Sequence, residues 1–194
     1  YFLSNLPDPK LVHSISDKYK QYKLTKNAGI DVPKTFLVNS IKSIDDIKDS
    51  IDYPVFIKAQ DVNIWRKKVS GHTKGFVINN EGELLNRLKV FIKDNVPVIV
   101  QEIIQSNDNQ NYKVCVFISP SGDYKLLFTL KKIHQNPIHF GVGASVKSIK
   151  YPELERIGLK LFSSIGYNGV GSAEFKYDKM DCKLKLIEIN PRYW

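Results

Sequence analysis

Short apolar runs bounded by Gly, Pro and Asn recur along the chain, and they predict buried strands. Two of them, PVFIKA at 54–59 and VPVIVQEII at 96–104, are almost continuously apolar, as strands covered on both faces are. Two further pairs of runs enclose turn sequences and predict hairpins. These pairs are 112–119 with 125–132, around Pro-Ser-Gly-Asp, and 170–177 with 182–190, around Asp-Lys-Met-Asp, and shorter strands are predicted at 34–39 and 76–79.

Helical periodicity is clearest at 151–165, where apolar residues recur at spacings of three and four. Further helices are predicted at 18–28, 43–51 and 83–93. The helix at 18–28 follows an N-cap at Ser16-Asp17 and stops at Gly29. Its apolar face is weak, so we expect it to lie on the surface.

Two segments lack any periodicity. Residues 60–75 are polar, basic and irregular, which predicts a mobile loop, and 134–143 are irregular as well. In order, the elements are strand, helix, strand, loop, strand, helix and strand, followed by hairpin, helix and hairpin. This order is typical of an α+β protein, here with two lobes hinged near residues 101–111.

Composition excludes several classes of protein. A chain of 194 residues that is 42% hydrophobic can bury a substantial core and is not a disordered tail. No run approaches eighteen apolar residues, and the first eleven residues carry neither a basic leader nor a cleavage site. We therefore expect a cytoplasmic protein without membrane association. Cys115 and Cys182 form neither a disulfide framework nor a metal-ligand pair, so both are interpreted as structural.

The net charge of +9 could serve nucleic acid, a membrane surface or small anions. The arginines among the 29 cations are only Arg66, Arg87, Arg156 and Arg192, whereas proteins that recognise bases and phosphates favour guanidinium groups. No block of five or six like charges occurs. Most lysines are therefore expected to form a solvated surface.

The last predicted strand carries Glu188 and Asn190, two positions apart in an otherwise apolar row. Alternation would put both on one face with the leucines that precede them. Ser172 and Glu174 stand in the same relation on the preceding strand, and the two glutamates share a face only if the turn contains an odd number of unpaired residues. Converging oxygen ligands would then suit Mg2+. On spacing alone, both glutamates could equally be ion-pair partners of the many lysines.

Three other positions are candidates for ligand contacts. Lys58 ends a buried strand just before the basic segment, and its ammonium could contact a ligand or simply reach water. The run GHTKG at 71–75 is a weak phosphate-loop candidate that would equally suit a hairpin turn. Glu102, followed by Ile103 and Ile104, ends the second buried strand, where one acceptor and one backbone donor could recognise an adenine edge.

Together these segments resemble the ATP-grasp superfamily, most closely the carboxylate-amine ligases related to the large subunit of carbamoyl-phosphate synthase. The segments that carry the resemblance are, in order, Ser16-Asp17-Lys18 with 27–33, then 53–58, 100–104, 169–175 and 188–192. The resemblance implies a two-lobed α+β fold with antiparallel sheets and the nucleotide between the lobes. Residues 1–32 would be a leading helical segment on the large lobe, 33–100 the small lobe with a phosphate lid at about 60–75, and 101–194 a large lobe truncated at its C-terminus.

The resemblance also implies roles for individual residues. The implied nucleotide contacts are Lys18 and Lys58 on the phosphates, Gln101, Glu102, Ile103 and Ile104 around the adenine, and Asp108 on the ribose hydroxyls. The implied ligands of Mg2+, with Mn2+ as an alternative, are Glu174, Glu188 and Asn190. Arg192 would hold the γ-phosphate and then the acyl phosphate, because its planar fork matches phosphate geometry. Lys131 or Lys132 would add positive charge.

The implied chemistry is the joining of a carboxylate to an amine. The carboxylate attacks the γ-phosphate of ATP to form an acyl phosphate, from which the amine displaces phosphate. The expected partners are small carboxylate and amine substrates, without nucleic acid or membrane, and a homodimer is one expected assembly. The lid has fewer glycines than the family usually carries there, and we expect the chain to be the core of a longer enzyme. The alternatives are a basic module that binds nucleic acid or another polyanion, and a nucleotide-binding relative without ligase activity.

Overall fold

The computed structural model describes residues 5–69, 73–107, 109–136 and 141–193, and the chain divides into two compact units. The smaller unit consists of Ser16–Tyr19 and Pro33–Ile103, and the larger consists of Tyr1–Ile15, Lys20–Val32 and Ile104–Trp194. Each unit has a sheet and a hydrophobic core of its own. Among the described residues, no helix has the length and apolar character needed to cross a membrane.

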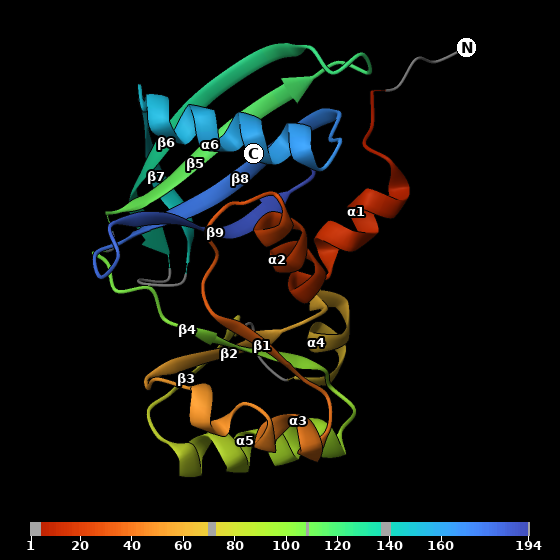
Figure 1. Cartoon of the computed structure of the whole chain (residues 1–194), viewed down its shortest axis with the longest axis vertical. Coiled ribbons are helices and arrows are strands. Elements are labelled where there is room, and N and C mark those ends of the chain that lie inside the picture. The colour runs from red at the N-terminus through yellow and green to blue at the C-terminus, as the bar shows by residue number, and fades with distance from the viewer. Residues whose placement is uncertain (1–4, 70–72, 108, 137–140, 194) are drawn as a thin grey trace. The chain divides into compact units, whose positions relative to one another are not determined.

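The smaller unit is built on an antiparallel sheet with the strand order β1-β4-β2-β3 (Figure 1). Its strands are β1 (Thr35–Val38), β2 (Val55–Ala59), β3 (Gly75–Ile78) and β4 (Val98–Glu102). Its helical segments are α3 (Ile41–Asp45), the 3-10 helix η1 (Lys48–Ser50), α4 (Val62–Lys68) and α5 (Glu81–Lys93). Alternate strand residues such as Val55 and Ile57 pack against Leu84 and Leu88 of α5, as the apolar pattern of the strands predicts.

The predicted helix at 43–51 is wrong in its extent. A capping box starts α3 earlier, since the Ser40 side chain accepts from the Ser43 N–H and Ser43 reciprocates. The α-helix ends at Asp45, and the remaining segment forms only the short turn η1. Capping geometry therefore decided these ends, whereas the isoleucine spacing located only the buried stripe.

The predicted mobile loop at 60–75 is wrong in its first half, because Val62–Lys68 forms α4. The Asp61 side chain caps this helix by accepting from Asn63 N at 2.7 Å and Ile64 N at 3.4 Å. Trp65 is 4% exposed, and its ring centroid lies 5.4 Å from that of Phe91. A single aromatic residue thus anchors a segment whose charge and polarity otherwise resemble those of a loop.

Replacing Asp61 by Ala is expected to lower the free energy of unfolding by about 1 kcal/mol, because the first N–H groups of α4 lose their acceptor. Denaturant unfolding measures this loss. The matched control is Asp94→Ala, which removes an exposed carboxylate from the end of α5, where it opposes the helix dipole. Equal losses in the two variants would contradict the capping role.

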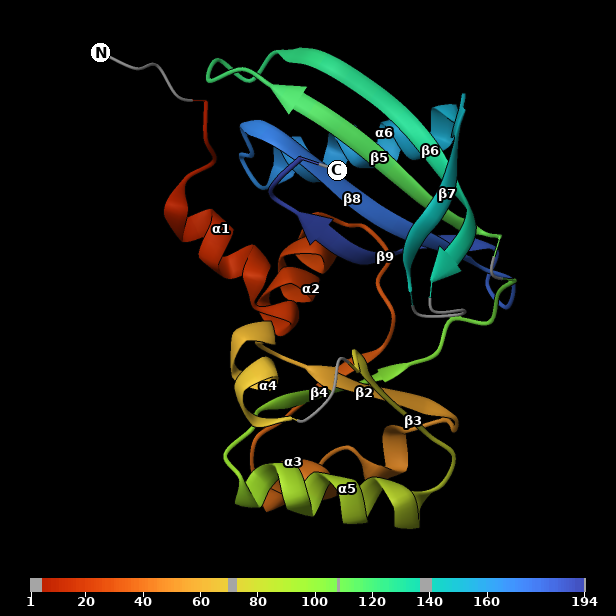
Figure 2. The same cartoon turned by 180° about the vertical axis from the view of Figure 1, so that it is seen from behind.

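The larger unit contains an antiparallel sheet with the strand order β7-β6-β5-β8-β9. Its strands are β5 (Asn111–Ile118), β6 (Tyr124–Asn136), β7 (Val142–Ile149), β8 (Gly169–Asp178) and β9 (Lys183–Asn190). Its helices are α1 (Pro9–Ser16), α2 (Lys18–Asn27) and α6 (Pro152–Ser164), with the first turn of α2 assigned to the smaller unit. Helix α6 covers one face of the sheet in Figure 1, and Figure 2 looks onto the opposite face.

The core of the larger unit lies between α6 and the sheet. Leu154, Leu161 and Phe162 of α6 pack on Val114 of β5 and Phe175 of β8. The helix predicted at 151–165 and both predicted hairpins are confirmed. The segment predicted to be irregular at 134–143 is wrong at both ends, since β6 continues to Asn136 and β7 begins at Val142, while 137–140 lie outside the described residues.

Helix α2 contradicts the expectation of a surface helix. Its buried residues are Gln21, Tyr22 and Thr25, and the first and last of these have no exposed surface. The Thr25 hydroxyl donates to the Gln21 backbone oxygen at 2.9 Å. Polar side chains can be buried when their groups find partners, and hydrophobic periodicity cannot reveal a helix that packs in this way.

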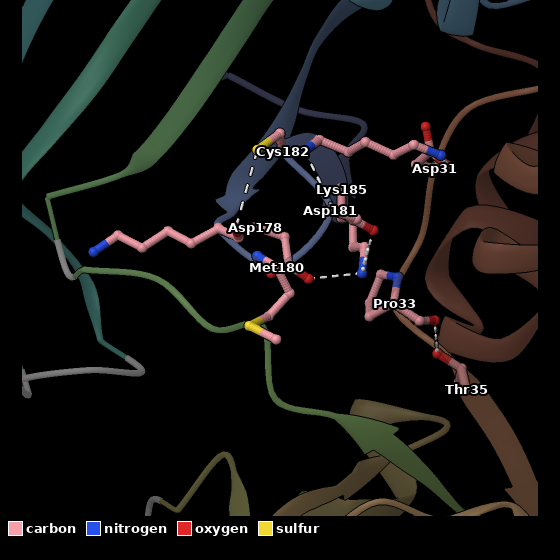
Figure 3. A network of polar contacts seen from close by, with 10 residues as sticks. Asp31, Pro33, Thr35, Asp178, Met180, Asp181, Cys182 and Lys185 are labelled. Atoms are coloured by element: carbon pink, nitrogen blue, oxygen red, sulfur yellow. Dashed lines mark hydrogen bonds and ion pairs between the residues drawn. The ribbon is translucent and has the colours of Figure 1, made fainter.

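An ion-pair network surrounds the turn between β8 and β9 (Figure 3). Lys185 Nζ lies 2.7 Å from Asp178 Oδ2 and 3.1 Å from Asp181 Oδ2. Lys183 Nζ lies 3.0 Å from Asp31 Oδ1. These pairs hold the turn end of the hairpin and so help to fix how the two strands are aligned.

Candidate functional site

Glu174 and Glu188 lie directly opposite each other on β8 and β9. The turn between these strands leaves 179–182 unpaired, an even number of residues that would by itself place Glu174 opposite Ile187. A β-bulge next to Glu174 makes Ile187 an extra residue and restores the pairing of the glutamates. An odd-numbered turn is therefore not the only way for the glutamates to share a face, because the bulge supplies the change of parity instead.

The bulge also overturns the expectation that Glu188 and Asn190 share a face with the leucines before them. Leu184 and Leu186 lie in the hydrophobic core together with Ile189. The polar residues on either side of Ile189 consequently face away from the core. Figure 2 looks onto this polar face of the sheet.

Glu174 lies between two lysines on the same face. Its Oε1 is 3.1 Å from Lys113 Nζ of β5, and its Oε2 is 2.5 Å from Lys132 Nζ of β6. The exposed fractions of the three side chains are 16%, 18% and 9%, respectively. Charges so poorly exposed to water interact more strongly than surface ions do, so these two ion pairs are stronger than ordinary surface pairs.

The structure separates Lys131 from Lys132, between which the sequence left the choice open. Lys131 is the cross-strand partner of Tyr112, and its Nζ lies 5.8 Å from the centroid of that ring. Successive residues of a strand point to opposite faces, so Lys132 lies on the polar face beside Glu174 and Lys131 does not.

Replacing Lys132 by Met is expected to lower the free energy of unfolding by about 2 kcal/mol, because Glu174 loses one of two partners in a poorly hydrated position. Lys131→Met is the matched control and is expected to cost about 0.5 kcal/mol, as a cation–π contact of a partly exposed lysine does. Urea unfolding of both variants measures the difference. A smaller effect for Lys132 than for Lys131 would contradict the assignment.

Cys115 and Ser172 are cross-strand partners on the same polar face. Burial raises the pKa of the Cys115 thiol to about 12, with Lys113 acting against this rise and Glu174 adding to it. The thiol is therefore protonated at neutral pH and is not a nucleophile. Ser172 Oγ is buried without a hydrogen-bond partner among the described residues, so the face contains a polar atom that a ligand could satisfy.

Arg192 is the second residue after β9 and is exposed. Its Nη2 donates to Asn190 Oδ1 at 3.4 Å, and its Nη1 donates to Tyr193 O at 3.1 Å. Asn190 is in turn the cross-strand partner of Ser172. The structure thus brings Arg192 together with Asn190, one of the predicted metal ligands.

In the smaller unit, Lys58 and Gln101 lie on the face of the sheet opposite the hydrophobic core, by their parity with the core residues of β2 and β4. Gln101 Nε2 donates to Thr35 Oγ1 at 2.7 Å. Gly75, the cross-strand partner of Lys58, lies so close to β2 that an added Cβ would be 2.2 Å from Ile57 O. This close approach explains Gly75 without a phosphate loop, and Gly71 and His72 of that candidate lie outside the described residues.

Gln101 and Glu102 line a small, open pocket of about 40 Å³ together with Lys34, Phe36 and Asp52. The Glu102 N–H donates to Lys34 O at 3.0 Å and continues the pairing of β4 beyond the end of β1. The next two residues are divided between the units. Ile103 ends a segment of the smaller unit, and Ile104 begins a segment of the larger one, where it is buried.

Lys18 opens α2, and its N–H donates to Gln60 O at 2.9 Å. The side chain of Gln60 donates in turn to Asp17 Oδ2 at 2.8 Å. These bonds tie the start of α2 to the residue that follows β2, within the smaller unit. Asp108, the predicted ribose contact, lies outside the described residues.

No family model matches the chain, but similar proteins exist. D-aspartate ligase of Enterococcus faecium is 23% identical over 202 residues, which cover 99% of this chain and 48% of the relative. The carbamoyl phosphate synthase large chain of Pseudothermotoga lettingae is 21% identical over 197 residues, which cover 95% of this chain and 17% of the relative. The chain therefore spans about half of the first relative and less than a fifth of the second.

Solved structures resemble the chain over nearly its whole length. The N5-carboxyaminoimidazole ribonucleotide synthetase of Thermus thermophilus has a TM-score of 0.72 at 16% identity, covering 97% of this chain and 48% of that one. The D-Ala:D-Ser ligase VanG of Enterococcus faecalis has a TM-score of 0.70 at 18% identity, covering 95% and 55%. The ATP-grasp ligase PsnB, solved with a precursor peptide and AMPPNP, has a TM-score of 0.65 at 15% identity, covering 96% and 52%. The chain has the ATP-grasp fold.

The ATP-grasp resemblance inferred from the sequence is thus confirmed, and so is the α+β fold with two antiparallel sheets. The names of D-aspartate ligase and of the D-Ala:D-Ser ligase agree with the predicted class of reaction. At these identities, the solved structures establish the fold of this chain, and its activity is considered below as a proposal.

The polar face of the larger ATP-grasp sheet fits a hard divalent cation. Carboxylates directly opposite each other repel, a cost that a cation bound by both would offset. Glu174 and Glu188 provide that pair, and Asn190 adds an amide oxygen next to the buried Ser172 hydroxyl. Within the described ranges, no group of three or more His, Cys, Asp or Glu could hold a metal ion, so a site here depends on the amide as well as the carboxylates.

Lys113 is a residue of this polar face that was not predicted from the sequence. It lies in an apolar strand and opposite Glu174 only because of the register between β5 and β8. A lysine at an alternating position of that strand was the one available signal, and it does not reveal which residue faces it.

Proposed function

We propose that the chain is the ATP-binding core of a magnesium-dependent ligase that joins a carboxylate to an amine through an acyl phosphate. The observation that carries this proposal is the pairing of Glu174 and Glu188 across β8 and β9, with Lys113 and Lys132 beside them on the face opposite the core. Paired carboxylates and adjacent ammonium groups are the groups that phosphoryl transfer requires. The ligases among its relatives support the same class of reaction.

In this proposal, Glu174, Glu188 and Asn190 hold Mg2+, or Mn2+ in its place. When bound, the cation neutralises phosphate charge and polarises the γ-phosphoryl group. Neutralising Glu174 also makes the Lys132 ammonium available to phosphate oxygens, because its carboxylate partner is then shared. Arg192, which already contacts Asn190, would hold the transferred phosphoryl group in its planar fork.

Other residues would bind the rest of the nucleotide. Lys18 and Lys58 are proposed to contact the phosphates. The adenine contacts are proposed to be Gln101, Glu102, Ile103 and Ile104, and the ribose contact Asp108. The proposed phosphate lid does not include α4, since Trp65 anchors that helix to the core of the unit. Lys131 lies on the opposite face of the sheet from Glu174 and is therefore not among the proposed phosphate contacts.

The proposed substrates are a small carboxylic acid and an amine. D-aspartate ligase is named for a substrate that carries both groups, which makes amino acids the first compounds to test. The division into lobes at 32 and 100, a homodimer and a cytoplasmic location stay predictions about the whole protein.

The test is phosphate release by the full-length protein with ATP, Mg2+ and a panel of amino acids and small carboxylic acids. Hydroxylamine in the assay would trap an acyl phosphate as a hydroxamate, so the expected result is hydroxamate that depends on one carboxylate and on Mg2+. Binding of ADP with Mg2+, but no hydroxamate with any acid, would favour a nucleotide-binding relative without ligase activity. Steeply salt-dependent binding to random duplex DNA without nucleotide binding would favour the polyanion alternative.

A further inference from the structure

We infer that Gln21 and Tyr22 of α2 are positioning residues that hold the bulge of β9 and thereby keep Glu188 on the metal-binding face. This inference rests on the proposed function, because it concerns the orientation of a proposed metal ligand. Both residues lie far in sequence from 169–175 and 188–192, in the helix between Ser16-Asp17-Lys18 and 27–33. The argument begins with the position of β9 in its sheet.

Strand β9 lies at the edge of the five-stranded sheet, with β8 on one side only. Helix α2 lies beside its other side in both views (Figures 1 and 2). The Tyr22 hydroxyl donates to Ile187 O at 2.5 Å, and Gln21 Oε1 accepts from Ile189 N at 3.0 Å. The two side chains therefore bind the backbone immediately before and immediately after Glu188.

A third bond holds the same edge. The Leu186 N–H donates to Asp31 O at 2.9 Å, and the Asp31 side chain pairs with Lys183. Backbone groups of three residues on the outer edge of β9 are thus hydrogen-bonded to α2 or to the segment that follows it. These residues are Leu186, Ile187 and Ile189. An edge strand normally leaves such groups to water or to another chain.

The contacts surround the one position where the register of β9 is irregular. Ile187 is the extra residue of the bulge. Without the bulge, the register set by the turn would place Ile187 opposite Glu174 and turn Glu188 toward the core. A bulged residue loses its ladder partner, so its backbone groups need bonds from elsewhere. The Tyr22 hydroxyl supplies one of these bonds from a side chain that is 3% exposed.

The cost of burying Gln21 supports a specific role for its oxygen. The side chain has no exposed surface, and its Nε2 is buried without a hydrogen-bond partner among the described residues. An apolar residue of similar volume would avoid the cost of that unpaired amide group. An apolar residue could not, however, accept a hydrogen bond from the Ile189 N–H. That bond holds the backbone immediately after Glu188.

The test compares Tyr22→Phe and Gln21→Met with Tyr167→Phe in calorimetric titrations of Mg2+ and ADP. Tyr167 is the matched control, because it is equally buried and its hydroxyl also donates to a strand carbonyl, that of Val170 at 2.7 Å, away from the glutamates. Tyr22→Phe and Gln21→Met are expected to weaken binding of ADP with Mg2+ roughly 10-fold, as loss of an outer contact to a metal ligand does. Affinity for ADP without the metal is expected to stay unchanged, as is the affinity of Tyr167→Phe under both conditions.

Amide hydrogen exchange provides a second measurement that does not depend on the ligand. Gln21→Met is expected to speed exchange of the Ile189 amide, while Tyr167→Phe leaves it unchanged. Equal metal-dependent affinities for Tyr22→Phe, Gln21→Met and Tyr167→Phe would overturn the inference, as would unchanged exchange at Ile189. Glu188→Gln separates the two levels of the argument. If it weakens binding while the α2 variants do not, only the positioning role fails, whereas unchanged binding in Glu188→Gln itself removes the proposed metal site.

Discussion

Replacing Glu188 by Gln is expected to lower the affinity for ADP in the presence of Mg2+ by about 100-fold, equivalent to roughly 2.8 kcal/mol. The substitution removes one of two carboxylates that face each other across β8 and β9. The amide retains the shape of the side chain and lacks the negative charge that a divalent cation requires. Isothermal titration calorimetry at fixed Mg2+ measures the loss.

The same substitution is expected to change the free energy of unfolding by less than about 1 kcal/mol in the absence of metal. Glu188 lies opposite Glu174, whose charge Lys113 and Lys132 already balance, so the metal-free protein does not depend on a second carboxylate there. The control is Glu153→Gln on the exposed first turn of α6, which should leave ADP binding unaltered. Loss of binding that tracks a loss of stability, or an equal loss in the control, would argue against a metal ligand at position 188.

Replacing Gly158 by Leu is expected to destabilise the protein by about 3 kcal/mol. Gly158 lies where α6 crosses β5, and a Cβ added there would lie 2.6 Å from Val114 Cγ1. Val114 is fully buried in the core of the larger unit, so neither element can move without disturbing the packing. For a chain of this length, the melting temperature is expected to fall by roughly 6 to 12 °C, which differential scanning calorimetry measures.

The matched control is Gly82→Leu in α5. Both glycines are helical, but Gly82 is exposed and an added Cβ would approach nothing closer than Asn80 Oδ1 at 3.4 Å. Leucine has the higher helix propensity, so this variant is expected to be as stable as the wild type or more so. A similar drop in both variants would mean that the cost arises from the helix backbone and not from the contact with Val114.

The metal-binding proposal depends on several sequence motifs. Each motif alone is weak evidence for a metal site, and only their order along the chain carries the resemblance. A glutamate near the end of an apolar strand is a common ion-pair partner, and Glu174 does form ion pairs with Lys113 and Lys132. The ion-pair interpretation therefore holds for Glu174, whose charge the two lysines balance, and the metal-ligand interpretation stays a proposal. In that proposal, the same ammonium groups would bind phosphate oxygens once a cation takes over the carboxylate.

Helices and strands that pack through apolar side chains were predictable from local sequence patterns. The strands β2 and β4, both hairpins and α6 follow from alternation, turn sequences and helical spacing, each of which acts within a few residues. Features held by polar or isolated contacts were not. Helix α4 depends on one buried tryptophan and an aspartate cap. The extent of α2 was predicted, but its burial was not, because it depends on Gln21 and Tyr22, whose partners are distant in sequence.

The sequence alone determined the fold class, the order of its elements and the residue types that could serve a nucleotide and a metal ion, because these depend on composition, periodicity and motif order. Only the tertiary structure decided which of those residues meet. Strand register placed Lys113 opposite Glu174, strand parity separated Lys132 from Lys131, and the bulge at Ile187 turned Glu188 toward Glu174. A one-residue shift reverses the face of every following side chain, and that shift is set by bonds between β9 and α2, more than 160 positions apart in the chain.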